Sequence, residues 1–160
     1  MKRKHGLVAA ATVAVCSAVA LPAEAIVRVG VDGGIQHFGA NGTYAMGRAE
    51  ASVGALPWFH LGGYAQLLEG FGNHEGGWGA GAVASFRPGI PGFKLDPMAF
   101  ASAGYQRIGV ARGFTVELGA GVSWHVASFI DLELRGAWVN IAERGAPSGF
   151  SGTLGIALVL

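Results

Sequence analysis

The feature that most constrains this chain is a strict two-residue alternation over positions 150–160. Large apolar side chains and one glycine occupy the even positions, and small or weakly polar side chains occupy the odd ones. Because successive side chains of a β-strand point to opposite faces, this segment is predicted to be a strand with one apolar face. Such a strand at an open sheet edge would invite aggregation. We therefore expect it to pair with the first strand and close a barrel.

Composition supports a small barrel with an apolar outer surface. The 160 residues are 51% hydrophobic and only 13% charged, and they include 28 glycines. A narrow barrel interior needs small side chains, and a membrane-facing exterior must be apolar. The length predicts one domain. A secreted soluble β-sandwich is the alternative that composition leaves open.

The first 25 residues have the pattern of a secretory signal peptide. A basic start at 2–4 and an uncharged apolar run at 6–20 precede the small-x-small pattern at 23–25. We expect cleavage after Ala25 and a mature domain over 26–160. Cys16 lies in the apolar run after Val15, which does not fit a lipoprotein. Removing 1–25 leaves no cysteine and changes the net charge from +1 to −1, so we expect no nucleic-acid partner.

The remaining chain shows about eight segments with a period of two, the smallest usual number for an outer-membrane barrel. The predicted strands cover 26–37, 44–56, 58–68, 77–87, 98–106, 114–125, 130–138 and 150–160. Both faces of the fifth segment are apolar, so the pattern leaves its phase open. We place Ala99, Ala101, Ala103 and Tyr105 outside. The predicted fold is all-β, an eight-stranded antiparallel up-and-down transmembrane β-barrel.

The predicted connections alternate in length. Polar connections at 39–43, 69–76, 107–113 and 140–149 are longer, and those after the second and sixth strands are tight. This alternation is typical of external loops and periplasmic turns. The connection 88–97 breaks the rule and contains three prolines. The sequence supplies no physical reason for its length.

Outward aromatic residues fall near the predicted strand ends. Aromatic girdles at both membrane interfaces are characteristic of such barrels. The expected periplasmic girdle is Phe59, Phe86 and Trp124, and the expected external girdle is Trp78, Tyr105, Phe114, Trp138 and Phe150.

The chain from 26 to 160 resembles the small OmpA/OmpX-type outer-membrane barrels, most closely over 119–138. Its end also resembles the C-terminal sorting signal of bacterial outer-membrane barrels through Thr153, Gly155, Leu158 and Leu160, although those barrels usually end in Phe. The resemblance implies a Gram-negative outer-membrane location. It also implies contact with lipid and lipopolysaccharide, and recognition of the last strand by the outer-membrane assembly machinery. We expect a monomer without the wall-anchoring role of longer relatives.

The strand phases direct a set of polar residues into the barrel. Unpaired burial of charge is costly, so these residues are expected to pair with one another. The set is Arg28, Asp32, Arg48, Glu50, Glu117, His125, Asp131, Glu133 and Arg135. One interpretation is an ion-pair plug that fills the lumen. The other is a polar path for water or small ions, gated by pairs such as Arg48–Glu117 or Arg135–Glu50.

An enzymatic site is not expected. The serine–histidine–acid chemistry of a hydrolase would have to use Ser123, His125, Ser128 and Glu117. The lipid A deacylase family has His and Ser two residues apart, followed by Asn. The segment 125–128 has the wrong spacing and no Asn. His74 and Glu75 are too few to predict a metal site, and no cofactor is expected.

We therefore predict a non-enzymatic outer-membrane barrel with a structural or surface-interaction role. A narrow channel for water, ions or small solutes is the alternative. A lipid A-modifying enzyme and a soluble secreted protein are less favoured.

Overall fold

The computed structural model describes residues 26–39, 42–90, 92–109, 111–142 and 148–160. The predicted signal peptide over 1–25 lies outside these residues, as does part of the predicted 140–149 loop. Within the described ranges, no helix is long and apolar enough to cross a lipid bilayer.

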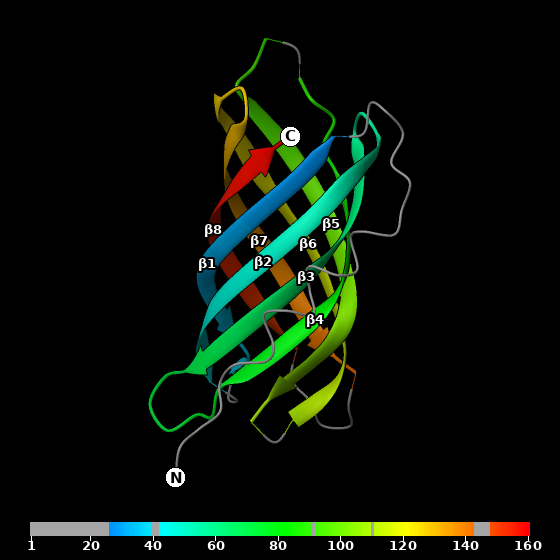
Figure 1. Cartoon of the computed structure of the whole chain (residues 1–160). Coiled ribbons are helices and arrows are strands. Elements are labelled where there is room, and N and C mark those ends of the chain that lie inside the picture. The colour runs from blue at the N-terminus through cyan, green and yellow to red at the C-terminus, as the bar shows by residue number, and fades with distance from the viewer. Residues whose placement is uncertain (1–25, 40–41, 91, 110, 143–147) are drawn as a thin grey trace, which may run out of the picture.

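Eight antiparallel strands form one closed barrel in sequence order (Figure 1). This confirms the predicted all-β, eight-stranded up-and-down architecture. The strands are β1 Val27–His37, β2 Thr43–Leu56, β3 Phe59–Gly70, β4 Gly77–Phe86, β5 Leu95–Ile108, β6 Ala111–Ala127, β7 Ile130–Ile141 and β8 Ser148–Val159.

The apolar strand at 150–160 closes the barrel, as its pattern indicated. β8 pairs with β1 from Arg28 opposite Val159 to His37 opposite Phe150. Just beyond these pairs, the Leu160 N–H donates to the Val27 carbonyl at 2.8 Å. We call this the terminal end of the barrel (top of Figure 1), and the opposite end, with the 71–76 connection, the loop end.

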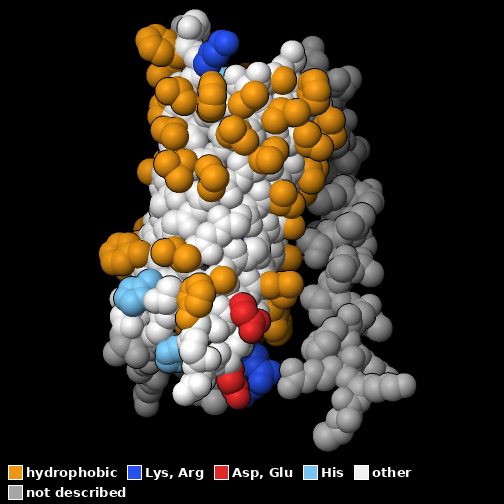
Figure 2. Space-filling view, turned by 90° about the vertical axis from the view of Figure 1, so that its left-hand side faces the viewer, with side chains coloured by type: hydrophobic (Ala, Val, Ile, Leu, Met, Phe, Trp, Pro, Cys, Tyr) orange, Lys and Arg blue, Asp and Glu red, His pale blue; other side chains and the backbone are white. Residues whose placement is uncertain are grey.

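Side chains alternate between the lumen and the outer surface along every strand. Figure 2 shows hydrophobic side chains over much of the outer surface, and charged and histidine side chains near the loop end. In β5, Ala99 and Tyr105 are exposed and Phe100 and Gln106 are buried, so the phase chosen for this strand is the one observed.

Glycines inside the barrel make room for larger side chains. A Cβ atom on Gly119 would lie 2.4 Å from Cζ of Phe100, and one on Gly155 would lie 1.9 Å from Oδ1 of Asp32. Real Cβ atoms do not approach so closely. The high glycine content therefore reflects the narrowness of the lumen.

The prediction of a loop at 107–113 is wrong. β5 and β6 stay paired as far as Ile108 opposite Ala111, which leaves only 109–110 as the connection. Gly109 has a φ of +55°, in the region that favours glycine in tight turns. β6 is accordingly 17 residues long, with both ends beyond the predicted range of 114–125.

The connection between β4 and β5 is also shorter than the predicted 88–97, because β5 begins at Leu95. Pro97 is therefore part of the strand, opposite Val122. The pairing of β5 with β4 reaches only to Ala99, so Pro97 lies where β5 has one neighbour. A proline is tolerated there because one side of the strand has no ladder to interrupt.

Candidate functional site in the barrel lumen

The structure places all nine predicted lumen residues inside the barrel. Eight of them are buried and His125 is partly exposed at the terminal end. They come from β1, β2, β6 and β7, whose inward phases the sequence had indicated. These residues are Arg28, Asp32, Arg48, Glu50, Glu117, His125, Asp131, Glu133 and Arg135.

Glu133 on β7 is the centre of the network. Its Oε1 accepts hydrogen bonds from Arg28 at 2.6 Å and from Arg87 at 2.7 Å. Its Oε2 accepts from Arg135 through both Nε, at 2.9 Å, and NH2. Three guanidinium groups thus converge on one carboxylate, in charge-assisted bonds that are stronger than neutral ones.

Arg135 extends the network toward the middle of the lumen. Its NH1 donates to Glu50 at 2.7 Å and lies 3.5 Å from Asp32. Glu50 is also 3.5 Å from Arg48. These contacts connect β1, β2 and β7 across the interior.

The next layer toward the loop end contains the predicted Arg48–Glu117 pair. Arg48 donates to Glu117 at 2.6 Å, and the hydroxyl of Ser102 donates to the same carboxylate oxygen at 2.7 Å. The Arg48 guanidinium also lies 4.0 Å from the ring centroid of Tyr64. This stacking supplies a cation–π contact in a desolvated site.

At the terminal end, His125 bridges two carboxylates. Nδ1 lies 2.6 Å from Asp131 and Nε2 lies 2.6 Å from Asp96. Asp131 also accepts from Arg28 at 2.6 Å and from Ser123 at 3.3 Å. The ion pairs therefore form a continuous network from the rim to the Arg48–Glu117 layer.

Sequence reasoning missed two members of this network, Arg87 and Asp96. Arg87 lies just before the proline-containing 88–97 segment, which the sequence predicts to be a connection, and Asp96 lies within it. Arg87 continues the inward phase of β4 after Val83 and Ser85, which are both buried. That phase was the signal that could have identified it. Asp96 carried no comparable signal, because its strand was predicted to begin at Met98.

Sequence reasoning also missed an apolar cluster that fills the lumen at the loop end. Its members come from five of the eight strands or the residues next to them, and each is no more than 6% exposed. They are Phe38, Tyr44, Leu68, Ile108, Val139 and Ile141. The lumen is therefore polar only in part, and its loop end is closed by hydrophobic packing.

Between this cluster and the ion pairs lies a layer of buried amides. Gln106 on β5 donates to Gln36 on β1 at 2.9 Å, across the full width of the barrel. Both polar atoms of Gln66 and the hydroxyl of Thr115 are buried without a hydrogen-bond partner among the described residues. Such atoms are costly to bury unless water reaches them.

The eight predicted girdle aromatics lie on the outer surface near the strand ends. At the terminal end, Phe59 pairs with Phe86, which also packs against Trp58 at a centroid distance of 5.4 Å. At the loop end, Trp78 and Tyr105 lie 5.8 Å apart. Phe114, Trp124, Trp138 and Phe150 are also exposed on the outer surface.

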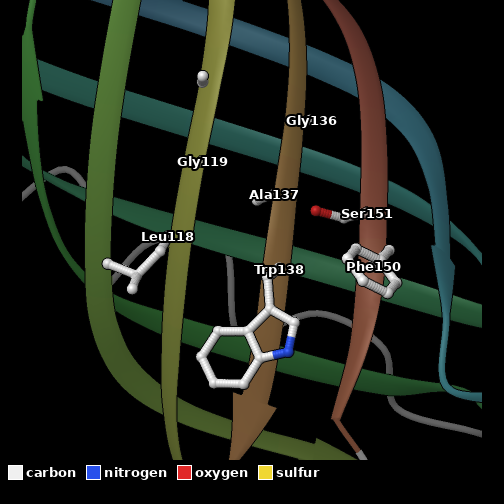
Figure 3. Close-up of a pocket in the computed structure, with 8 residues that line it drawn as sticks. Leu118, Gly119, Gly136, Ala137, Trp138, Phe150 and Ser151 are labelled. Carbon is white, nitrogen blue, oxygen red and sulfur yellow. The ribbon is translucent and has the colours of Figure 1, made fainter.

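A shallow groove crosses the outer surface of β6, β7 and β8 (Figure 3). The residues that line it include Leu118, Ala120, Gly136, Trp138 and Phe150. None of the residues that line it is titratable. The groove is therefore a hollow in the apolar surface without catalytic groups.

The residues of the predicted sorting signal lie on both faces of β8. Thr153 is buried in the lumen, whereas Leu158 and Leu160 are exposed outside. In the loop between β3 and β4, His74 packs against the ring of Tyr44 at a centroid distance of 6.0 Å. Among the described residues, no group of three His, Cys, Asp or Glu side chains could hold a metal ion.

Comparison with known proteins identifies the fold of this chain but assigns it to no family. No family model matches the sequence, and no curated protein matches it. Neisserial surface protein A superposes with a TM-score of 0.68 at 11% identity, over 84% of this chain and 96% of that one. In fold, this chain is similar to the small bacterial outer-membrane barrels.

Two further solved structures support the same conclusion. The N-terminal barrel domain of Pseudomonas aeruginosa OprF has a TM-score of 0.63 at 13% identity, over 83% of this chain and 97% of that one. Ail, the attachment invasion locus protein of Yersinia pestis, has a TM-score of 0.57 at 9% identity, over 85% and 97%. Identities this low establish a shared fold alone, and one fold can support several functions.

Proposed function

We propose that this chain is an integral outer-membrane barrel with a non-enzymatic structural or surface-interaction role and a closed lumen. The observation that carries the proposal is the division between the two faces of its strands. Large apolar side chains such as Val31, Leu67 and Leu154 are 62–66% exposed outside, while the charged groups pair inside. A soluble protein would bury the first set, and a bilayer accommodates it.

Two layers support a closed lumen. The ion-pair network crosses the lumen from β2 to β6 and from β2 to β7 through contacts of 2.6 and 2.7 Å, and the apolar cluster fills the loop end. A charged solute would have to displace paired charges and then cross a hydrophobic constriction. Either step is unfavourable without an opening motion.

The positions of the candidate catalytic groups favour a non-enzymatic role. Both ring nitrogens of His125 already face carboxylates, and Ser123 donates to Asp131 rather than to the imidazole. A serine nucleophile needs a base within hydrogen-bond reach of its own hydroxyl. We also propose that the protein needs no cofactor for this role.

The proposed partners follow from the location. The exposed apolar surface would contact outer-membrane lipid and lipopolysaccharide, and β8 would be recognised by the assembly machinery during insertion. We propose a monomer, because β1 and β8 pair with each other and close the sheet into a barrel.

A narrow channel for water, ions or small solutes is the second candidate. The amide of Gln66 and the hydroxyl of Thr115 have no hydrogen-bond partner among the described residues, and this favours the channel, because buried polar atoms without protein partners need water. A channel would also have to pass the apolar cluster.

The test is electrophoretic mobility of the membrane-extracted protein with and without boiling, together with planar-bilayer recording. We expect a heat-dependent shift in mobility and no single-channel steps. Extraction without detergent and no heat-dependent shift would contradict the membrane location. A shift accompanied by steady conductance would favour the channel over the closed barrel.

A further inference from the structure

The connection between β4 and β5 is held firmly against the terminal end of the barrel. Arg87 at its start donates to Glu133 inside the lumen at 2.7 Å. The Ile90 N–H donates to the Asp96 carboxylate at 3.1 Å, and the His125 N–H donates to the Lys94 carbonyl at 2.9 Å. Both ends of the connection are therefore fixed to the barrel wall.

Two internal features shape the connection. The Phe93 N–H donates to the Ile90 carbonyl at 3.0 Å and closes a turn. Gly89 and Gly92 have φ values of +56° and +83°, which side-chain-bearing residues rarely adopt. The chain can therefore bend sharply at both glycines.

This well-anchored segment presents apolar side chains away from the barrel. Phe93 is 69% exposed and Ile90 is 42% exposed, with the charged side chain of Lys94 also exposed beside them. Figure 2 shows hydrophobic side chains and a basic one at the top of the molecule, beyond the barrel wall.

The exposed groups continue the apolar outer surface. Leu95, next to Lys94, is 54% exposed on the outer face of β5 and lies opposite Trp124, which is 48% exposed. The apolar surface of β5 and β6 therefore extends without interruption onto the connection. Under the proposed function, this end faces the periplasm, because two of its three connections, 57–58 and 128–129, are two-residue turns, against one of four at the loop end.

We propose that Ile90, Phe93 and Lys94 form an anchor for the inner leaflet of the outer membrane, with anionic phospholipid as its partner. Phe93 and Ile90 enter the boundary between headgroups and acyl chains, and the Lys94 ammonium contacts a lipid phosphate. Aromatic rings and lysines with apolar stems favour this depth. Because hydrogen bonds of Arg87 and Lys94 attach both ends of the connection to the barrel, insertion costs little conformational entropy. This inference rests on the proposed membrane location.

The test uses an environment-sensitive fluorophore on single cysteines in a Cys16→Ala background of the full chain. Phe93→Cys probes the anchor, Leu154→Cys is the reference for the apolar surface, and Asn73→Cys is the aqueous reference. The labelled proteins are reconstituted in vesicles of phosphatidylethanolamine with or without phosphatidylglycerol. We expect the label at 93 to emit at shorter wavelengths than that at 73, and more so with phosphatidylglycerol. Lys94→Glu should remove the dependence on phosphatidylglycerol, and Lys94→Arg should keep it.

The references separate failure of this inference from failure of the proposed function. If the label at 154 reports an apolar environment but the label at 93 emits like the one at 73, the anchor is overturned and the membrane barrel stands. If 154 itself matches 73, the membrane location fails and the anchor fails with it. If 93 becomes apolar only in native membranes and never in pure lipid, the partner is a protein, which overturns the lipid assignment.

Discussion

Arg48 on β2 and Glu117 on β6 form an ion pair of 2.6 Å across the full width of the lumen. Three strands lie between β2 and β6 in either direction around the barrel, so the pair joins opposite walls. The side chains of both residues are no more than 5% exposed. The pair therefore links opposite walls of the barrel, and its removal should lower the stability of the whole barrel.

Arg48→Met should lower the free energy of unfolding by about 3–5 kcal/mol, because Glu117 would remain buried without its cation. The double variant Arg48→Met, Glu117→Met should recover much of this loss. Urea titration of the detergent-solubilised barrel, followed by gel mobility, measures both. Arg107→Met, at an exposed position, is the control. An unchanged urea midpoint with altered bilayer conductance would instead favour a gating role.

Glu133→Gln should destabilise the barrel more than Glu117→Gln. Three guanidinium groups share the Glu133 carboxylate, and without its charge they would repel one another. We expect a loss at or above about 3–5 kcal/mol in the same titration. Glu69→Gln, on an exposed side chain, should change the midpoint little. Equal effects at 133 and 117 would show that the network has no dominant centre.

Gly119→Ala should destabilise the barrel by about 1–3 kcal/mol through overpacking. The new Cβ would meet both the Phe100 ring at 2.4 Å and the Gly136 carbonyl oxygen at 2.6 Å. Gly136→Ala is the matched control, because its Cβ would find no atom closer than 3.9 Å on the outer surface. Phe100→Ala should not rescue Gly119→Ala fully, since the clash with the carbonyl remains. Equal stability of the two alanine variants would contradict this packing.

Gln66→Met should be neutral or stabilising, because neither polar atom of Gln66 has a partner among the described residues. An unsatisfied buried group costs about 1–3 kcal/mol, and methionine removes that cost with little change in volume. Gln36→Met should destabilise, since it breaks the bond to Gln106. If Gln66→Met is instead clearly destabilising, water is bound to the amide. That result would strengthen the channel hypothesis.

The strand phases were predictable because the lumen and the membrane impose opposite demands on alternate residues. Arg48, Glu117, Arg135 and Glu50 could be paired in advance for this reason, since phase and height together leave few partners. The lengths of the strands were harder to predict from the sequence. The range 107–113 contains residues typical of a loop. β5 and β6 nevertheless remain paired as far as Ile108 opposite Ala111, because each strand offers the other backbone hydrogen-bond partners there.

The sequence alone determined the strand alternation, the closure of the barrel by its last strand and the polar character of nine lumen positions. Only the tertiary structure brought Asp96 into the network, because the pairing of β5 with β6 extends through a proline-containing segment. It also decided that the loop end is apolar. The six residues of that cluster are scattered from 38 to 141, and only the relative register of their strands brings them to one height.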